Sequence, residues 1–183
     1  MRIISGDLGG RRIHPPTDMP HTRPTTDIAK EGLFNILQNN LDFEELKTLD
    51  LFGGTGAISY ELASRGAPDL TIVEKDTKMH AFIEKTVKEL RIENIRVVRS
   101  EVFRFIETCG TAYDFIFAGP PYALATIDEI PRAIFQHGLL KPGGWFILEH
   151  TPRNDYKGFP HFRWERNYGT TVFTLFVNEA EEA

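Results

Sequence analysis

The sequence predicts an α/β fold, in which a mostly parallel sheet is covered by helices on both faces. Between residues 48 and 149, apolar runs of strand length alternate with stretches that have helical periodicity. Strands that alternate with helices pair in parallel, because each helix returns the chain to the same edge of the sheet. Near the C-terminus two apolar runs, 162–165 and 171–177, enclose a short turn and no helix. They predict an antiparallel hairpin that completes a seven-stranded sheet.

Length and composition indicate a single folded core. The chain has 183 residues, of which 41% are hydrophobic and 26% are charged, so wholesale disorder is excluded. No apolar run approaches the roughly 18 residues of a membrane span, and the N-terminus lacks an apolar stretch of signal-peptide length. The single cysteine, Cys109, excludes a disulfide framework and a cysteine-based metal site, so no metal is expected. We expect a cytoplasmic protein that does not enter a membrane.

The first 24 residues are expected to form a basic arm ahead of a main domain at residues 25–183. Two short strands, 1–5 and 11–14, flank a glycine-rich turn and predict a β-hairpin, and four prolines break regular structure after it. The whole chain has a formal charge of -5, so any contact with nucleic acid must be local. The arginines of the arm are candidates for such a contact, or for an ordinary solvated surface: Arg2, Arg11, Arg12 and Arg23.

Helices and strands follow in a regular order after the arm. Thr25 or Thr26 can cap a helix that begins at Asp27 and has apolar residues at helical spacing. A strand at 48–52 leads through a glycine loop into a helix that ends before Gly66. The further elements expected are a strand at 70–74, a helix at 77–90, a strand at 95–99 with a short helix after it, a strand at 113–118, a helix at 127–137, a turn at 141–144 and a strand at 145–149.

The glycine loop after the first of these strands is a candidate cofactor site. Glycines let the backbone approach a ligand closely, and the N–H groups at the start of the next helix are donors. Glu74, at the end of the second strand, is placed to accept two ribose hydroxyls, and Glu101 either accepts an adenine amine or caps a helix. Ser59 stands where a dinucleotide site needs a third small residue, which favours a single adenosyl group. The loop candidates are Asp50, Phe52, Gly54, Thr55 and Gly56.

The fourth strand runs into Gly119-Pro120-Pro121-Tyr122. This sequence resembles the Asp/Asn-Pro-Pro-Tyr motif of S-adenosylmethionine-dependent methyltransferases that modify exocyclic amines of bases. Such an amine must pyramidalise before it attacks a methyl group, and acceptors placed at its N–H bonds assist. The proline pair fixes backbone carbonyls that can be those acceptors, and the tyrosine ring offers a face for a base swung out of its stack. All four residues are therefore catalytic candidates.

Further motifs are distributed over nearly the whole chain. They are Met1-Arg2-Ile3-Ile4-Ser5-Gly6, Gly10-Arg11, Arg23-Pro24-Thr25-Thr26-Asp27, Leu33-Phe34-Asn35, Asp50-Leu51-Phe52, Gly54-Thr55-Gly56, Glu74-Lys75-Asp76, Pro120-Pro121-Tyr122 and Tyr168-Gly169-Thr170. Together they resemble the bacterial 16S rRNA (guanine-N2)-methyltransferase family of the RsmD type.

The resemblance implies a Rossmann-like class I methyltransferase fold with S-adenosylmethionine as the cofactor. It implies that Lys75 joins Glu74 in the cofactor site and that the four arginines of the arm contact RNA. The reaction implied is methyl transfer to the 2-amino group of a guanine in 16S rRNA, within an assembling 30S particle. We expect the protein to act as a monomer.

Gly119 departs from the family pattern, which has an aspartate at this position. Without that side chain the site lacks one acceptor for the amine, and a well-placed polar group typically contributes about 3–4 kcal/mol to lowering a barrier. Three interpretations stay open. Backbone carbonyls suffice, or Glu149 or His150 at the end of the next strand supplies the acceptor, or the protein is a weakly catalytic or non-catalytic RNA-binding or assembly factor.

Two other enzyme classes are weaker alternatives. An adenine-N6 or DNA methyltransferase shares the glycine loop and the Pro-Pro-Tyr sequence, but the N-terminal arm argues against it. A nicotinamide oxidoreductase is disfavoured by Ser59 and by the same Pro-Pro-Tyr sequence.

Overall fold

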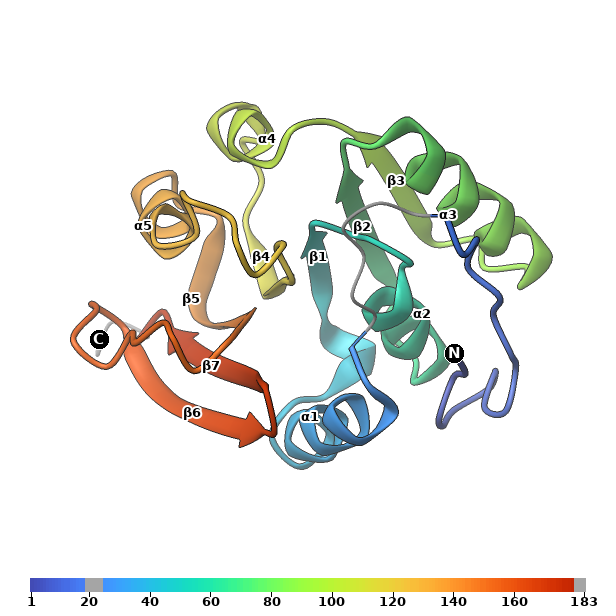
Figure 1. Ribbon diagram of the computed structural model, residues 1–183, viewed down its shortest axis with the longest axis horizontal. Coiled ribbons are helices and arrows are strands. Elements are labelled where there is room, and N and C mark those ends of the chain that lie inside the picture. The colour runs from blue at the N-terminus through green and yellow to red at the C-terminus, as the bar shows by residue number, and fades with distance from the viewer. Residues whose placement is uncertain (19–24, 180–183) are drawn as a thin grey trace.

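The computed structural model describes residues 1–18 and 25–179, and within them the chain forms one seven-stranded sheet (Figure 1). The strands are β1 (Lys47–Leu51), β2 (Asp69–Glu74), β3 (Ile95–Arg99), β4 (Tyr113–Ala118), β5 (Leu140–His150), β6 (Phe162–Tyr168) and β7 (Thr171–Val177). Their order is β3-β2-β1-β4-β5-β7-β6, and β7 runs antiparallel to both of its neighbours while the other pairs are parallel. The predicted α/β class and the C-terminal hairpin are confirmed.

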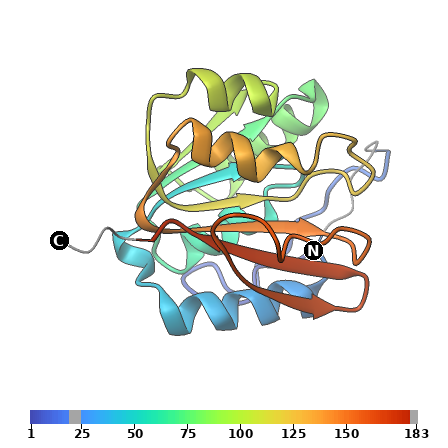
Figure 2. The same cartoon turned by 90° about the vertical axis from the view of Figure 1, so that its left-hand side faces the viewer.

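Helices cover both faces of this sheet. They are α1 (Asp27–Asn40), α2 (Ala57–Ser64), α3 (Thr77–Glu89), α4 (Val102–Thr108) and α5 (Glu129–Gln136), with a short 3-10 helix at Phe43–Glu45. α4 and α5 pack on one face, and α1 and α2 pack on the other (Figure 2). Each face therefore has its own apolar core. Among the described residues, no helix is both long enough and apolar enough to span a bilayer.

The local signals set most of the element boundaries. The side chain of Thr26 accepts the N–H of Ala29 at 3.2 Å, so the predicted helix cap at 26 is confirmed. α2 ends just before Gly66, which has φ of +107° and lets the chain leave the helix in a left-handed conformation. β3 and β4 have the predicted bounds.

β5 differs from the sequence-based expectation. A turn was expected at 141–144, but the strand already begins at Leu140 and runs through both glycines. The reason is tertiary pairing, because Gly143 donates its N–H to the carbonyl of Asn178 and Asn178 donates to the carbonyl of Gly144. The chain after β7 thus continues the ladder and holds the Lys-Pro-Gly-Gly segment extended.

The N-terminal hairpin is also shorter than predicted. Instead of strands at 1–5 and 11–14, there is one isolated antiparallel bridge between Arg2 and Arg12, with backbone hydrogen bonds on either side. The hairpin is held by what lies beneath it. Ile3 and Ile13 are buried in a cluster with Tyr60 of α2, so side-chain burial replaces part of the missing strand ladder.

The parallel strands bring their carboxyl ends to one edge of the sheet. Leu51 pairs with Val73 of β2 and with Ala118 of β4, and Ala118 pairs in turn with Leu148 of β5. The loops that follow these four strands therefore open side by side, as expected for a ligand site in an open α/β sheet.

Candidate active site

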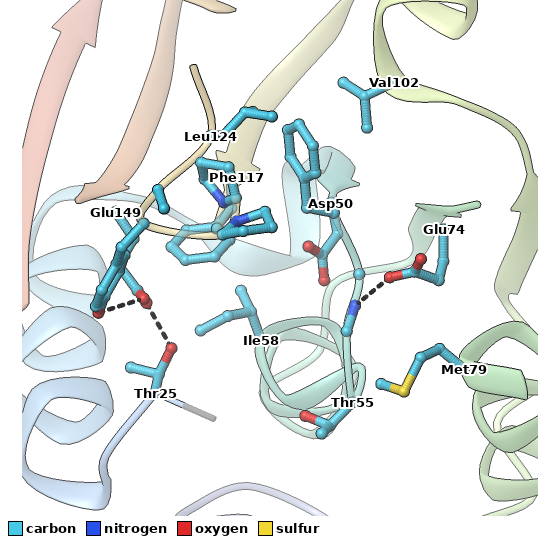
Figure 3. A pocket seen from close by; sticks show the side chains of 18 of the residues that line it. Thr25, Asp50, Thr55, Ile58, Glu74, Met79, Val102, Phe117, Leu124 and Glu149 are labelled. Carbon is cyan, nitrogen blue, oxygen red and sulfur yellow. Dashed lines mark hydrogen bonds between the residues drawn. The ribbon is translucent and has the colours of Figure 1, made fainter. Parts of the chain in front are cut away.

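A cavity of about 950 Å³ lies at this edge of the sheet, among the loops after β1, β2, β3, β4 and β5 (Figure 3). It has the size of a site that holds a small-molecule ligand. Most of the predicted cofactor and catalytic residues line it: Asp50, Phe52, Gly54, Thr55, Glu74, Lys75, Glu101, Gly119, Pro120, Pro121 and Tyr122. The sheet topology thus brings the two candidate loops, which are more than 60 positions apart in the chain, to a single cavity.

The glycine loop has a strained backbone where it faces the cavity. Phe52 and Gly54 have φ of +60° and +58°, a region that costs energy for a side chain as large as phenylalanine. A Cβ on Gly54 would meet only the carbonyl of Phe52, at 3.8 Å, so the backbone here lies open to a ligand. Gly56 does not line the cavity, and a Cβ there would lie 2.4 Å from the Tyr60 ring. Glycine at position 56 therefore lets the loop pack closely against the ring of Tyr60.

Glu74 is fixed by the backbone around it. One carboxylate oxygen accepts the N–H of Gly54 and the other accepts the N–H of Asp76, both at 2.9 Å. A carboxylate oxygen has a second lone pair, so each oxygen keeps the capacity to accept a hydroxyl. The side chain therefore joins the glycine loop to the end of β2 and stays oriented at the cavity wall (Figure 3).

Asp50 is a buried carboxyl at the base of the cavity. It is 3% exposed, and Ser59 of α2 donates a hydrogen bond to it at 2.8 Å. Burial raises the pKa of Asp50 to about 7, while the hydrogen bond from Ser59 works in the opposite direction.

Glu101 has a structural role that is visible in the geometry. Its carboxylate accepts the N–H groups of Phe103 and Arg104 at 3.0 and 2.8 Å, which makes it the N-cap of α4. The capping interpretation is thus confirmed, and contact with an adenine amine stays a prediction. Sequence reasoning missed the apolar side chains of this part of the wall, which lie in the first turns of α3 and α4: Met79, Val102 and Phe103.

The Pro-Pro-Tyr loop forms the opposite wall. A Cβ on Gly119 would lie 3.1 Å from the ring of Phe117, so a side chain here fits only if that ring shifts slightly. The hydroxyl of Tyr122 donates to Glu149 at 2.9 Å, and Glu149 itself lines the cavity. His150 does not line it; its ring is buried and hydrogen-bonded to Thr174 and to the carbonyl of Thr151. Of the two proposed substitutes for the missing aspartate, only Glu149 lies at the site.

The arginines of the arm lie beside the main cavity. Arg2 and Arg12 line a second cavity of about 550 Å³ next to the start of α1, and Arg2 pairs with Asp27 at 3.2 Å. Thr25 lines both cavities, which makes them neighbours. Arg11 is exposed and is not part of either lining, and Arg23 lies outside the described residues.

Comparison with known proteins extends this description. The family model described as "Conserved hypothetical protein 95" matches residues 1–177. "Ribosomal RNA small subunit methyltransferase D" of Escherichia coli K12 is 31% identical over 185 residues, covering 99% of this chain and 91% of that protein. The protein of the same name from Buchnera aphidicola of Acyrthosiphon pisum is 36% identical over 148 residues, covering 80% of this chain and 76% of its own.

Solved structures agree with the sequence comparison. The Escherichia coli protein yhhF superimposes with a TM-score of 0.85 at 29% identity, covering 99% of both chains. The Thermus thermophilus 16S rRNA N2 G1207 methyltransferase RsmC, solved with AdoMet and guanosine, shares the fold with a TM-score of 0.68 at 23% identity, over 85% of this chain and 44% of that one. By family model, sequence identity and class I methyltransferase fold, the chain belongs to the conserved hypothetical protein 95 family, whose curated members include the bacterial small-subunit rRNA methyltransferases D.

Proposed function

We propose that this chain transfers a methyl group from S-adenosylmethionine to the N2 amine of a guanine in 16S rRNA. The observation that carries the proposal is the single cavity that the glycine loop shares with Pro120, Pro121 and Tyr122. One wall suits an adenosyl cofactor and the other suits a base with an exocyclic amine. The relatives that are named as small-subunit rRNA methyltransferases support this choice of substrate over a DNA base.

The residues of the first wall fit S-adenosylmethionine. Glu74 has acceptor capacity for ribose hydroxyls, the open backbone at Gly54 permits close approach, and the apolar residues Met79 and Val102 suit an adenine ring. Asp50 is a buried carboxyl of the cavity lining, and a cationic donor bound beside it would favour its ionised form. When bound, the cofactor supplies an electrophilic methyl group.

The second wall has groups that orient an amine. The backbone carbonyls of Gly119 and Pro120 are acceptors for its N–H bonds, and the proline rings restrict the backbone around them. The ring of Tyr122 provides a stacking face for a guanine that has left its helix or loop. Positioning of the amine in line with the methyl group is then the main contribution of the protein to the rate.

The arm at residues 1–24 completes the proposal as an RNA-binding appendage to the methyltransferase domain at 25–183. Arg2, Arg11, Arg12 and Arg23 hold phosphates or bases of the RNA. A protein with a net charge of -5 and a local basic surface suits a folded ribonucleoprotein, so we propose an assembling 30S particle as the substrate. The protein acts there as a monomer, in the cytoplasm where ribosomes are assembled.

Transfer of a labelled methyl group tests this function. The purified chain is incubated with tritiated S-adenosylmethionine and either naked 16S rRNA or 30S particles from a strain that lacks the enzyme. Label in a single N2-methylguanine, with greater transfer to the particle, is the expected result. Particles already methylated by the chain are the matched control and should accept no label.

Other results would change the proposal. Label in an N6-methyladenine would replace guanine by adenine as the target. Tight binding of the cofactor without transfer to either substrate would favour a non-catalytic assembly factor, in agreement with the absence of a side chain at Gly119.

A further inference from the structure

Glu149 occupies the position beside the missing side chain of the catalytic loop. Ala118 at the end of β4 pairs with Leu148 of the parallel strand β5. Gly119 directly follows Ala118, and Glu149 directly follows Leu148. Glu149 is 4% exposed, yet it lines the cavity, and Figure 3 shows its carboxylate between two hydroxyl groups. A buried carboxylate at a cavity wall requires donors, and these donors connect separate parts of the chain.

Both oxygens of this carboxylate accept a hydrogen bond. Oε1 accepts the hydroxyl of Thr25, just before α1, at 2.6 Å, and Oε2 accepts the phenol of Tyr122 at 2.9 Å. The Tyr122 oxygen also lies 3.2 Å from the hydroxyl of Thr171 on β7. Burial raises the pKa of Glu149, and the two hydroxyl donors counteract that effect by stabilising its charge.

The loop that carries Tyr122 has little backbone support of its own. Pro120 and Pro121 have no N–H group to donate. The N–H of Gly119 reaches the carbonyl of Leu51 only at 3.3 Å, and the next backbone bond, from Leu124 to Pro121, lies beyond the proline pair. Because these backbone bonds are few, the hydrogen bond from the phenol of Tyr122 to Glu149 is a point at which a side chain fixes the loop to the sheet.

We propose that Glu149 is a positioning residue for methyl transfer, which fixes the ring of Tyr122 and the carbonyls before it through the Tyr122 hydroxyl. The proposal rests on the proposed function and adds a residue to it. An acid at position 119 would face the amine directly. Glu149 lies on the neighbouring strand β5, and its effect on the amine passes through Tyr122. Tyr122 contacts the base, and Glu149 determines where the ring lies.

Two conservative variants test the contact between Glu149 and Tyr122. Tyr122→Phe removes the hydroxyl and keeps the ring, and Glu149→Gln keeps the size of the side chain but has only one acceptor oxygen for its two donors. Each is expected to lower kcat for methylation about 10- to 100-fold, the range of a charge-assisted hydrogen bond. The KM for RNA and the affinity for S-adenosylmethionine should stay within about twofold, because neither variant removes a contact surface.

Combining the variants provides the decisive comparison. If Glu149 acts through Tyr122, the double variant should lose no more kcat than the worse single variant. Glu165→Gln is the matched control; this glutamate on β6 pairs with Lys157 at 3.3 Å, outside the cavity lining, and its substitution should leave kcat unchanged. Additive losses, or a loss in Glu149→Gln far greater than in Tyr122→Phe, would overturn the proposal and place Glu149 in direct contact with the amine.

A stability measurement separates this proposal from the proposed function. The same three variants, compared by denaturant unfolding, form a double-mutant cycle that needs no substrate. Coupling between Glu149 and Tyr122 is expected, and its absence would overturn the positioning role. If the unmodified chain transfers no methyl group to RNA while the cycle shows coupling, the proposed function fails and the contact that positions Tyr122 stands.

Discussion

Asp50 is the residue at which stability and function conflict most clearly. Its carboxyl is buried and has a hydrogen-bond donor in Ser59, and burial raises its pKa to about 7 from an ordinary value near 3.8. Between these values the folded state binds the proton and the unfolded state does not. Raising the pH through this window therefore destabilises the fold, by on the order of 4 kcal/mol once Asp50 is ionised in both states.

Replacement of Asp50 by asparagine should remove this pH dependence. The quantity compared is the melting temperature of Asp50→Asn minus that of the unmodified protein. This difference is expected to be about 5–10 °C more positive at pH 8 than at pH 5, because the amide cannot ionise. Thermal unfolding at the two pH values measures the difference. Asp155→Asn, which changes an exposed aspartate, is the matched substitution control. Equal differences at both pH values would show that Asp50 does not titrate in this window.

Gly119 shows that a sequence motif does not by itself define the geometry of a site. In sequence, the glycine removes an acceptor from a familiar motif. In the structure, the ring of Phe117 lies close to where a side chain would be, and the carboxylate that Tyr122 contacts comes from β5. The effect of a missing side chain depends on which neighbours the sheet places around it.

At the scale of elements, α2 connects the cofactor loop to the N-terminal hairpin. Its Glu61 is fully buried and accepts the N–H groups of Ile4 and Ser5 at 2.8 and 3.1 Å. The same carboxylate pairs with Arg65 at 2.9 Å and with the buried Lys30 of α1 at 3.5 Å. Burial lowers the pKa of Lys30, and the charge of Glu61 opposes that shift. One buried acid thus fixes the hairpin to two helices.

Glu61→Gln should therefore affect stability and RNA binding together. Neutralising Glu61 leaves the buried charge of Lys30 without its adjacent carboxylate, with the carbonyl of Arg2 as its remaining hydrogen-bond partner. Breaking a buried pair in this way typically costs about 3–5 kcal/mol and lowers the melting temperature by roughly 6–15 °C. The displaced hairpin should raise the KM for RNA, while the affinity for S-adenosylmethionine, measured by calorimetry below the melting temperature, should stay within about twofold. Glu31→Gln, on the exposed side of α1, is the control. An unchanged melting temperature would contradict the role of Glu61 in fixing the hairpin to the two helices.

At the scale of the whole molecule, the distribution of charge matters more than its sum. The chain carries 21 basic and 26 acidic residues, so it repels a polyanion on average. Arg2 and Arg12 nevertheless lie together at a cavity next to the active site, and Arg11 is exposed on the same hairpin. We expect local attraction beside the cavity and repulsion elsewhere to restrict RNA binding to one orientation.

The double variant Arg11→Ala/Arg12→Ala tests this orientation. It should raise the KM for RNA several-fold and reduce the slope of log affinity against log salt by about 1.5 units, as expected for two lost phosphate contacts. Lys85→Ala/Lys88→Ala on the exposed side of α3 makes the same change in charge and should leave that slope nearly unaltered. Equal slopes for the two double variants would show that net charge, and not the hairpin, governs RNA binding.

Local signals in the amino-acid sequence are sufficient to predict the order of the elements and the residues of the two loops. Apolar periodicity and glycine positions depend on local conformational preference, so they located β3 and β4 and the end of α2 correctly. The same signals placed Glu74 at the carboxyl end of a parallel strand, an edge at which ligand sites of such sheets lie. Tyr122 was identified in a different way, by the resemblance of Gly119-Pro120-Pro121-Tyr122 to a methyltransferase motif.

Features that depend on contacts between distant segments could not be predicted in this way, and they come from the folding of the whole chain. It extended β5 through two glycines that pair with Asn178, and it reduced the N-terminal hairpin to a single bridge held by side chains beneath it. It also selected Glu149 rather than His150 for the cavity, although the two are consecutive in a strand. Successive side chains of a strand point to opposite faces, and the environment of each face comes from elements that lie far away in the sequence.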